Sequence, residues 1–180
     1  IEEFPGVDVQ CDLEKRWPWD DGSVDEIFTV DLPEHLRVWW ETPDLEKVAE
    51  AIAKLGPALE KSDRELLDET RWACRHLVDA ITKPKRTYGI IHFMNEANRV
   101  LKAGGRLIAR IPTTESRAWA QDPTHVSFWN ENTFLYFTHP AYRGLYPHLI
   151  KGAWKPLEVK TSVPNMFGES WVTAVLEKAA

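Results

Sequence analysis

The chain has 180 residues, of which 43% are hydrophobic and 28% charged, and a formal net charge of -6. This length suits one domain with a sizeable core, and the acidic balance argues against a dedicated nucleic-acid binder. No apolar run approaches the roughly 18 residues that span a bilayer, and no signal sequence is recognised. Cys11 and Cys74 form neither a disulfide framework nor a zinc pattern, so we expect reduced thiols and a cytoplasmic protein.

The amino-terminal part reads as two short strands. Residues 7–11 alternate apolar and polar side chains after a Pro-Gly turn, which favours a strand. A loop rich in tryptophan follows over residues 14–22. Residues 24–30 are rich in β-branched and aromatic side chains and predict a second strand, which ends before Asp31 and Pro33.

Residues 42–86 have a different character. Apolar side chains recur every three or four positions over residues 42–59, and again after a capping-box pattern at residues 62–65. This spacing predicts two amphipathic helices. We interpret the helical hairpin as an insertion into a single domain, residues 1–180. The one-sided apolar face over residues 42–82 indicates a lid, or a surface for a partner or for a second copy of the chain.

A third helix is predicted over residues 88–102, with apolar side chains on one face and Gly104 as its stop. A strand follows over residues 106–111 and ends at Pro112. This close succession of helix and strand is typical of an α/β sheet that is parallel at least in part.

The remaining chain predicts a loop, a short helix and two strands. Residues 113–129 have the composition of a loop, and Asn130 can cap a short helix over residues 131–137. Alternating side chains predict strands over residues 156–163 and 169–176.

Two segments carry a known pattern. Residues 93–107 (FMNEANRVLKAGGRL) lead a helix through two glycines into a strand, and residues 9–28 (VQCDLEKRWPWDDGSVDEIF) precede them. They resemble the "E-x-x-R-V-L-K-P-G-G" and "D-L-x-x-x-P-(F/W)-x-D-x-S-(F/V)-D" signatures of class I S-adenosylmethionine-dependent methyltransferases. Ala103 stands where the family usually has proline. This difference makes the turn less rigid but removes no group that takes part in a reaction.

Two further segments agree with this resemblance. Residues 32–36 (LPEHL) are similar to the "L-E-H" run that follows the family's fourth strand. Residues 121–137 (QDPTHVSFWNENTFLYF) resemble the acceptor-side wall of a subgroup found often in bacterial and phage proteins. The resemblance implies a Rossmann-like methyltransferase sheet in which residues 24–30 are the fourth strand and residues 106–111 the fifth.

The family's first strand and its glycine-rich cofactor loop have no counterpart in these residues. That strand is central in the family's sheet, so without it the fourth strand, residues 24–30, would have an unpaired edge. Because Ile1 is not a methionine, we expect the chain to be a fragment, a processed form or the ordered part of a longer protein. The missing N-terminal strands would then lie upstream, or a partner chain would complete the sheet.

The resemblance implies that Asp12, Leu13, Trp17 and Asp31 bind S-adenosylmethionine. Asp12 would accept a hydrogen bond from the adenine amino group, and Leu13 and Trp17 would sandwich the adenine ring. Asp31 would orient the methionine ammonium or the acceptor. The alternatives are that the two carboxylates cap their own loops and that Trp17 only packs.

Methyl transfer is an in-line displacement that depends mainly on alignment, and a base is needed only for a protonated acceptor. His125, beside Asp122, is the first candidate base and His35 the second, although a histidine held by a carboxylate for structural reasons fits equally well. No metal site is expected, because the pairs Glu34/His35 and Asp122/His125 lack a dedicated ligand spacing.

The resemblance implies methyl transfer from S-adenosylmethionine, and we expect the acceptor to be a small molecule, or a sugar or peptide group, in an aromatic-walled cleft. The alternative is a methyltransferase-like domain without catalysis that serves as an interaction or structural module, which the missing glycine loop favours. A nucleotide-sugar or dinucleotide enzyme is less well supported, because the GxGxxG fingerprint is absent too.

Overall fold

The computed structural model describes residues 6–40, 49–50, 53, 74 and 86–179. The chain divides into two compact units, residues 1–37 with 88–180 and residues 38–87. The predicted hairpin at residues 42–82 lies outside the described residues except for four positions, each of them helical. In chain order, the elements are β1 (Val24–Val30), η1 (Pro33–His35), β2 (Val38–Trp40), β3 (Arg86–Tyr88), α3 (Gly89–Val100), β4 (Leu101–Pro112), α4 (Arg117–Ala120), η2 (Glu131–Phe134), α5 (Leu135–Thr138), α6 (Pro140–Arg143), β5 (Trp154–Thr161) and β6 (Trp171–Lys178).

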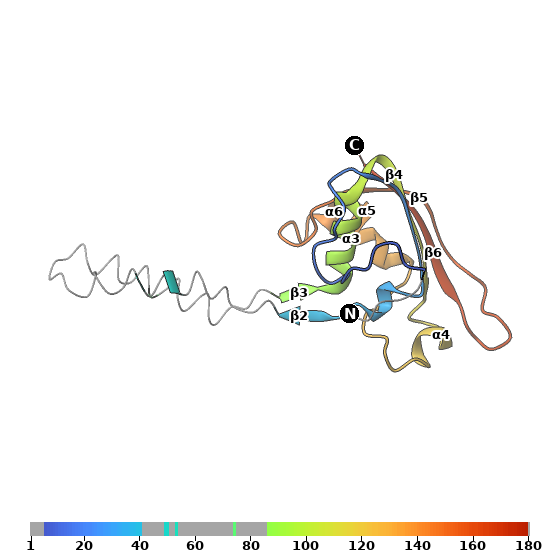
Figure 1. Cartoon of the computed structure of the whole chain (residues 1–180). Helices are drawn as coiled ribbons and strands as arrows, with labels where there is room; N and C mark the ends of the chain where they lie inside the picture. The colour runs from blue at the N-terminus through green and yellow to red at the C-terminus, as the bar shows by residue number, and fades with distance from the viewer. Residues whose placement is uncertain (1–5, 41–48, 51–52, 54–73, 75–85, 180) are drawn as a thin grey trace. The chain divides into compact units, whose positions relative to one another are not determined.

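The larger unit is built on a mixed sheet of four strands in the order β1-β4-β6-β5 (Figure 1). β1 pairs with β4 in parallel, and α3 precedes β4 in the connection between them. β6 is antiparallel to both β4 and β5. The predicted partly parallel α/β sheet is therefore confirmed, and so are the two late strands. β2 and β3 form a separate two-stranded ladder.

Helix α3 forms because apolar residues recur along one side of it. Phe93, Met94, Ala97 and Val100 are buried, and their spacing of one, three and three residues follows one helical face. The predicted helix is confirmed, but its predicted end is wrong. The backbone is already extended at Leu101, and the chain passes directly into β4.

Gly104 therefore has a different role from the predicted helix stop. It lies inside β4 with φ 74°, where the pairing with β1 jumps from Val24↔Leu101 to Glu26↔Arg106. The extra residues of β4 form an irregularity that needs one positive φ, which glycine adopts without a Cβ clash. The two glycines of the motif thus shape the entry of β4 into the sheet.

One face of the sheet is buried and the other is open. Inward-facing side chains of β4 and β6 are fully buried, and α3, α5 and α6 lie on the same side of the sheet in Figure 1. On the opposite face, Phe28 is 69% exposed, and Arg110 lies over the ring of Trp171 at 4.2 Å. The alternating buried residues where β4 pairs with β6 are Leu107, Ala109, Ile111, Val172, Ala174 and Leu176.

The predicted strand over residues 7–11 is wrong. These residues have no regular structure, and Val7 and Val9 are about half exposed. Alternation alone does not make a strand without a neighbour to accept its backbone hydrogen bonds. The short helix predicted over residues 131–137 is confirmed as η2 followed by α5, with Asn130 accepting from the Thr133 N–H as its cap.

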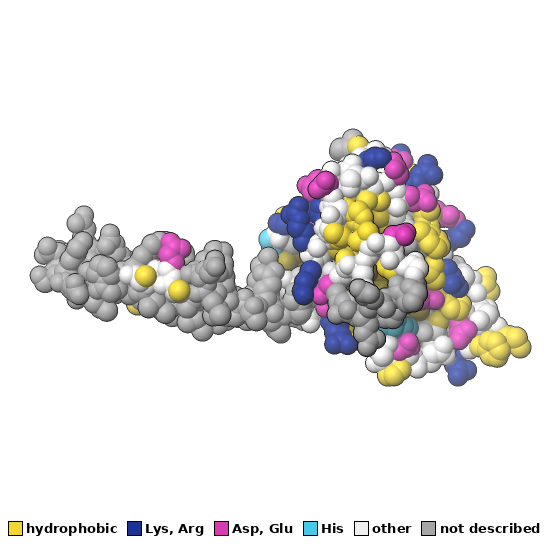
Figure 2. Space-filling model, in the orientation of Figure 1, with side chains coloured by type: hydrophobic (Ala, Val, Ile, Leu, Met, Phe, Trp, Pro, Cys, Tyr) yellow, Lys and Arg dark blue, Asp and Glu magenta, His cyan; other side chains and the backbone are white. Residues whose placement is uncertain are grey.

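β1 is an edge strand in the described part of the chain, since it pairs with β4 alone. Several apolar side chains elsewhere are also exposed, and Figure 2 shows hydrophobic side chains gathered in patches on the larger unit.

The loop before β1 is held against α3 by a motif residue. Arg99 donates to the carbonyl oxygens of Trp17 (3.0 Å) and Trp19 (2.8 Å), to Asp21 Oδ1 (2.7 Å) and to both oxygens of Glu96. The Glu96 carboxylate in turn accepts from the Trp17 N–H at 2.8 Å. The acidic and the basic residue of the "E-x-x-R" motif, Glu96 and Arg99, therefore join α3 to the tryptophan loop, residues 14–22.

Candidate functional site

The candidate site lies where the chain leaves the parallel strand pair. Asp31 follows β1 with φ 49°, and its N–H donates to the Arg110 carbonyl of β4 at 3.0 Å. The chain then turns at once into η1, with Pro33 at its first position, where a missing N–H and a fixed φ are tolerated. This turn directs Glu34 and His35 toward the carboxyl ends of β1 and β4, the edge where open α/β sheets bind ligands.

A second segment, residues 122–129, closes the site. The Glu34 carbonyl accepts from the Val126 N–H (2.9 Å) and the Ser127 N–H (3.0 Å), and Ser127 Oγ donates to the Pro33 carbonyl. These bonds fix the backbone of η1 against the loop that carries His125.

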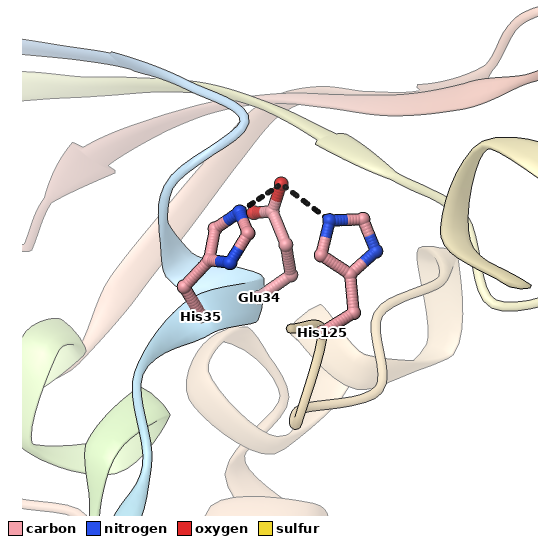
Figure 3. Close-up of side chains that lie close together, drawn as sticks. All are labelled: Glu34, His35 and His125. Atoms are coloured by element: carbon pink, nitrogen blue, oxygen red, sulfur yellow. Dashed lines mark ion pairs between the residues drawn. The ribbon is translucent and has the colours of Figure 1, made fainter. Parts of the chain in front are cut away.

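Glu34, His35 and His125 form a compact cluster, with the carboxylate between the two rings (Figure 3). Glu34 Oε1 lies 3.9 Å from His35 Nε2 and 3.7 Å from His125 Nε2. The two rings meet edge to face at 4.7 Å. One ligand atom from each residue falls within 4.8 Å of the others. We call these three residues the Glu–His–His cluster.

The carboxylate of Glu34 is the most unusual group of the cluster. Its side chain is 0% exposed, and neither oxygen has a hydrogen-bond partner among the described residues. Burial raises the pKa of Glu34 above its ordinary value, because the charged form loses its hydration. A buried carboxylate without donors needs a proton or a cation nearby.

Hydrogen bonds at the outer nitrogens fix the orientation of both imidazoles. His125 Nδ1 lies 2.9 Å from the Trp119 carbonyl oxygen, which can only accept, so this nitrogen carries the proton. His35 Nδ1 lies 3.0 Å from Thr124 Oγ1, and that hydroxyl donates to Asp122 Oδ1 at 2.6 Å. In both neutral rings, Nε2 therefore presents its lone pair to Glu34.

Asp122 supports the cluster from the solvent side. Its Oδ2 lies 3.7 Å from His125 Nε2, and its side chain is 41% exposed. Hydrogen bonds from the Thr124 hydroxyl and N–H hold the pKa of Asp122 below its usual range. Asp122 is therefore ionised while it orients Thr124 and, through it, His35.

Aromatic side chains fix the loop around His125. Trp119 donates to the Ser127 carbonyl at 2.8 Å and stacks on Phe128 at 5.0 Å. Trp129 is fully buried and donates to Ser127 Oγ at 2.9 Å. These rings leave His125 only 5% exposed, whereas His35 is 35% exposed.

The residues implied for the cofactor site do not all come together. Asp12 accepts from the Glu14 N–H at 3.0 Å and pairs with Lys15 at 3.3 Å, so it caps its own loop. Asp31 Oδ1 accepts from the indole N–H of Trp171 at 3.0 Å. Trp17 is 4% exposed and packs edge to face on Phe93.

Leu13 and Trp17 line a shared groove. Its volume is about 380 Å³, and its other walls come from β1, α3 and the tryptophan loop. Because it is lined by Ile27 and Phe28, which point to opposite faces of β1, the groove runs along the edge of that strand. A second pocket of about 410 Å³ is mainly apolar and aromatic, and the Glu–His–His cluster lines neither space.

The sequence predicted His35, Asp122 and His125 as site residues, and the structure brings these three together. It also adds Glu34, which the sequence analysis considered only as part of a motif and as one of a His-containing pair without metal-ligand spacing. A signal was available, because an acidic residue beside a histidine in a proline-initiated turn after a strand is well positioned for a site. Its burial could not be foreseen, since it depends on the loop that carries His125.

No protein-family model matches the chain, and no curated protein matches it either. Among solved structures, the chain is similar to one from the "Complex between the Haloferax volcanii Trm112 methyltransferase activator and the putative methyltransferase". The two share 12% identity over 94% of this chain and 60% of that chain, with a TM-score of 0.46. This chain thus spans about 60% of the length of that structure. A likeness of this degree shows neither the family nor the function of the chain.

In the described part of the chain, no helix has the length and apolar character needed to cross a membrane.

Proposed function

We propose that the chain is part of an S-adenosylmethionine-dependent methyltransferase with a Rossmann-like sheet, and that the Glu–His–His cluster lies on its acceptor side. One observation carries the proposal. The segments that resemble methyltransferase signatures form a parallel β1/β4 pair, and the ionisable cluster lies at its carboxyl ends, where such sheets bind ligands.

The cofactor would contact the segment that leads into β1. Leu13 and Trp17 supply apolar walls on one side of the groove, and Asp12 and Asp31 supply carboxylates for the adenine amino group and the methionine ammonium. Both carboxylates also have partners within the chain, so cofactor binding would share or replace these contacts.

The reaction would be an in-line displacement. A nucleophilic oxygen or nitrogen of the acceptor bonds to the methyl carbon while the carbon–sulfur bond breaks, which leaves S-adenosylhomocysteine. For a hydroxyl or ammonium acceptor, a proton must leave, and His35 Nε2 can take it near neutral pH. His35 is better suited than the deeply buried His125, because it is more exposed. Asp122 and His125 would position it.

A small molecule, or a sugar or peptide group, remains the proposed class of acceptor. The rings of Trp119 and Phe128 beside His125 support an aromatic wall for it. Aromatic faces contribute apolar contact area and favour flat or partly apolar groups.

The second candidate is a methyltransferase-like interaction module without catalysis. The open edge of β1 favours it, since an edge strand with exposed Phe28 is suited to pair with another chain. In that case Asp12 would only cap its own loop, and Asp31 would only accept from the Trp171 indole.

Calorimetric titration of the full-length protein with S-adenosylmethionine and S-adenosylhomocysteine separates the two candidates. The methyltransferase proposal expects binding of both and a rise in melting temperature. Asp12→Asn should weaken binding about 10- to 100-fold, as expected for one hydrogen bond to a charged group, while Asp20→Asn on the exposed loop serves as the control. If neither ligand gives a heat of binding or a thermal shift, the result contradicts the methyltransferase proposal and favours the interaction module.

A further inference from the structure

We propose that Glu34, His35 and His125 bind a divalent first-row transition-metal ion, with Zn²⁺ as the reference ion. The three residues offer two imidazole nitrogens and one carboxylate oxygen, and all three atoms lie within 4.8 Å of one another. Two histidines and one carboxylate are a recurrent ligand set for zinc and for non-haem iron. The proposal departs from the sequence-based expectation of no metal site.

The separations suit atoms that share one ion better than atoms that share a hydrogen bond. Ligands at about 2.0–2.2 Å from a common ion lie roughly 3.0–3.5 Å apart. The observed distances from Glu34 Oε1 to the two Nε2 atoms are 3.7 Å and 3.9 Å. A contraction of a few tenths of an ångström would bring the Glu34 oxygen to ligand distances from both nitrogens, and both contacts are longer than a direct hydrogen bond.

The buried carboxylate points independently to a cation. Glu34 is fully buried, and its oxygens have no hydrogen-bond donor within the described ranges. Isolating an ionised carboxylate in this way costs several kcal/mol, so such groups are normally paired or coordinate a metal. The two Nε2 nitrogens lie 3.7 Å and 3.9 Å from Oε1, and in neutral rings they add lone pairs rather than protons.

The outer hydrogen bonds match the requirements of metal-binding histidines. Such a histidine usually donates its other N–H to a carbonyl, carboxylate or similar group, which fixes the ring and the tautomer. His125 does so to the Trp119 carbonyl, and His35 does so to Thr124, which is in turn bonded to Asp122. Both rings are therefore held with Nε2 facing Glu34 before any ion arrives.

An ion can reach the cluster from the side of His35 and Asp122, whose side chains are 35% and 41% exposed. Two imidazoles disfavour Mg²⁺ and Ca²⁺, which prefer oxygen ligands. With an ion bound, the Nε2 atoms are ligands and do not accept protons, so the metal would replace His35 as the group that activates an acceptor. The metal assignment does not depend on methyl transfer, because it rests on the cluster alone.

The test is metal binding by the full-length, EDTA-treated and dialysed protein. Titration with Zn²⁺ alone should show one saturable site per chain, and Co²⁺ should give visible absorption bands typical of nitrogen and oxygen ligands. Glu34→Gln and His125→Ala should each weaken Zn²⁺ binding more than the roughly 10- to 100-fold loss that follows removal of an orienting group. Thr124→Val should fall within that range. His148→Ala, an exposed histidine outside the cluster, is the matched control and should bind normally.

Circular dichroism and thermal melting of the metal-free variants show whether each has folded. If His125→Ala does not fold, Glu34→Gln still tests the proposal, because glutamine has nearly the same shape as glutamate. Absence of a saturable site in the parent protein would overturn the proposal, and so would unchanged affinity in Glu34→Gln. In either case the cluster is stabilised by a shared proton instead. Because the titration contains no S-adenosylmethionine, its failure leaves the proposed methyl transfer to be decided by its own calorimetry.

Discussion

Glu96 and Arg99 lie one turn apart on α3, and the Arg99 Nη2 atom donates to Glu96 Oε2 at 2.7 Å. The pair also holds the tryptophan loop, since Glu96 accepts from the Trp17 N–H and Arg99 donates to the carbonyls of Trp17 and Trp19. The acidic and basic residues that support the family resemblance therefore have a structural task, which is to join two segments that are distant in the sequence.

Arg99→Ala should lower the free energy of unfolding by about 2–3 kcal/mol, because several carbonyl and carboxylate acceptors lose their charged donor. Arg99→Lys should recover only part of it, since an ammonium cannot reproduce the planar arrangement of donors. Urea denaturation followed by tryptophan fluorescence measures both. Equal stability of the parent and the alanine variant would mean that this contact does not hold the loop.

The same pair predicts how stability depends on pH. Burial alone would raise the pKa of Glu96, but hydrogen bonds from Arg99 and from the Trp17 N–H outweigh it and keep this pKa below its ordinary value. A lowered folded-state pKa contributes stability that is present above the unfolded pKa of about 4.3 and is lost as pH falls through the folded value.

The stability gap between the parent protein and Glu96→Gln should therefore be full near pH 7 and close progressively below about pH 4. Denaturation curves at several pH values test this, with Glu158→Gln on the exposed part of β5 as a control. A gap that stays constant down to acidic pH would contradict the assigned role of the carboxylate.

The two glycines of the motif should respond differently to substitution. A Cβ at Gly105 would lie 2.9 Å from the Lys102 carbonyl oxygen and 3.0 Å from the Asp25 carbonyl oxygen, both backbone atoms. Gly105→Ala should therefore cost about 1–3 kcal/mol through overpacking. A Cβ added at Gly104 would meet no atom within 4 Å, but the φ of this residue is 74°. Gly104→Ala should therefore lower the free energy of unfolding by about 1 kcal/mol through backbone strain.

Gly104→Asn is the control for this interpretation, because asparagine tolerates positive φ better than alanine does. Thermal unfolding of the three variants should rank the losses as Gly105→Ala largest and Gly104→Asn smallest. If asparagine and alanine at position 104 were equally destabilising, the strain would not come from φ.

Replacement of Glu34 should make the metal-free protein more stable and weaken its binding of Zn²⁺. In metal-free protein, Glu34→Gln removes a buried carboxyl group that has no hydrogen-bond partner among the described residues. It supplies an amide N–H, which can donate to an Nε2 lone pair once the two atoms, 3.7–3.9 Å apart in the parent, approach by about 0.5 Å. We expect the free energy of unfolding to rise by about 1–3 kcal/mol, while Zn²⁺ no longer stabilises the variant. Denaturation with EDTA and then with Zn²⁺ measures both effects, and a loss of stability in EDTA would show that the carboxylate is already satisfied.

The sequence by itself determined the order and type of most elements. Local periodicity predicted α3, β1, and the two late strands, because burial of one face repeats along the chain at the period of a helix or a strand. It failed for residues 7–11, which form no strand, and for the end of α3, where Leu101 is already extended.

Only the tertiary structure decided the candidate site. His35, Asp122 and His125 could be selected as polar residues in family-like segments, but nothing local shows that Val126 and Ser127 bond to the Glu34 carbonyl and draw the two segments together. Burial of the Glu34 carboxylate follows from that long-range contact. The distance from this carboxylate to each histidine depends on how the loop packs. The sequence shows only that a carboxylate and two histidines are present.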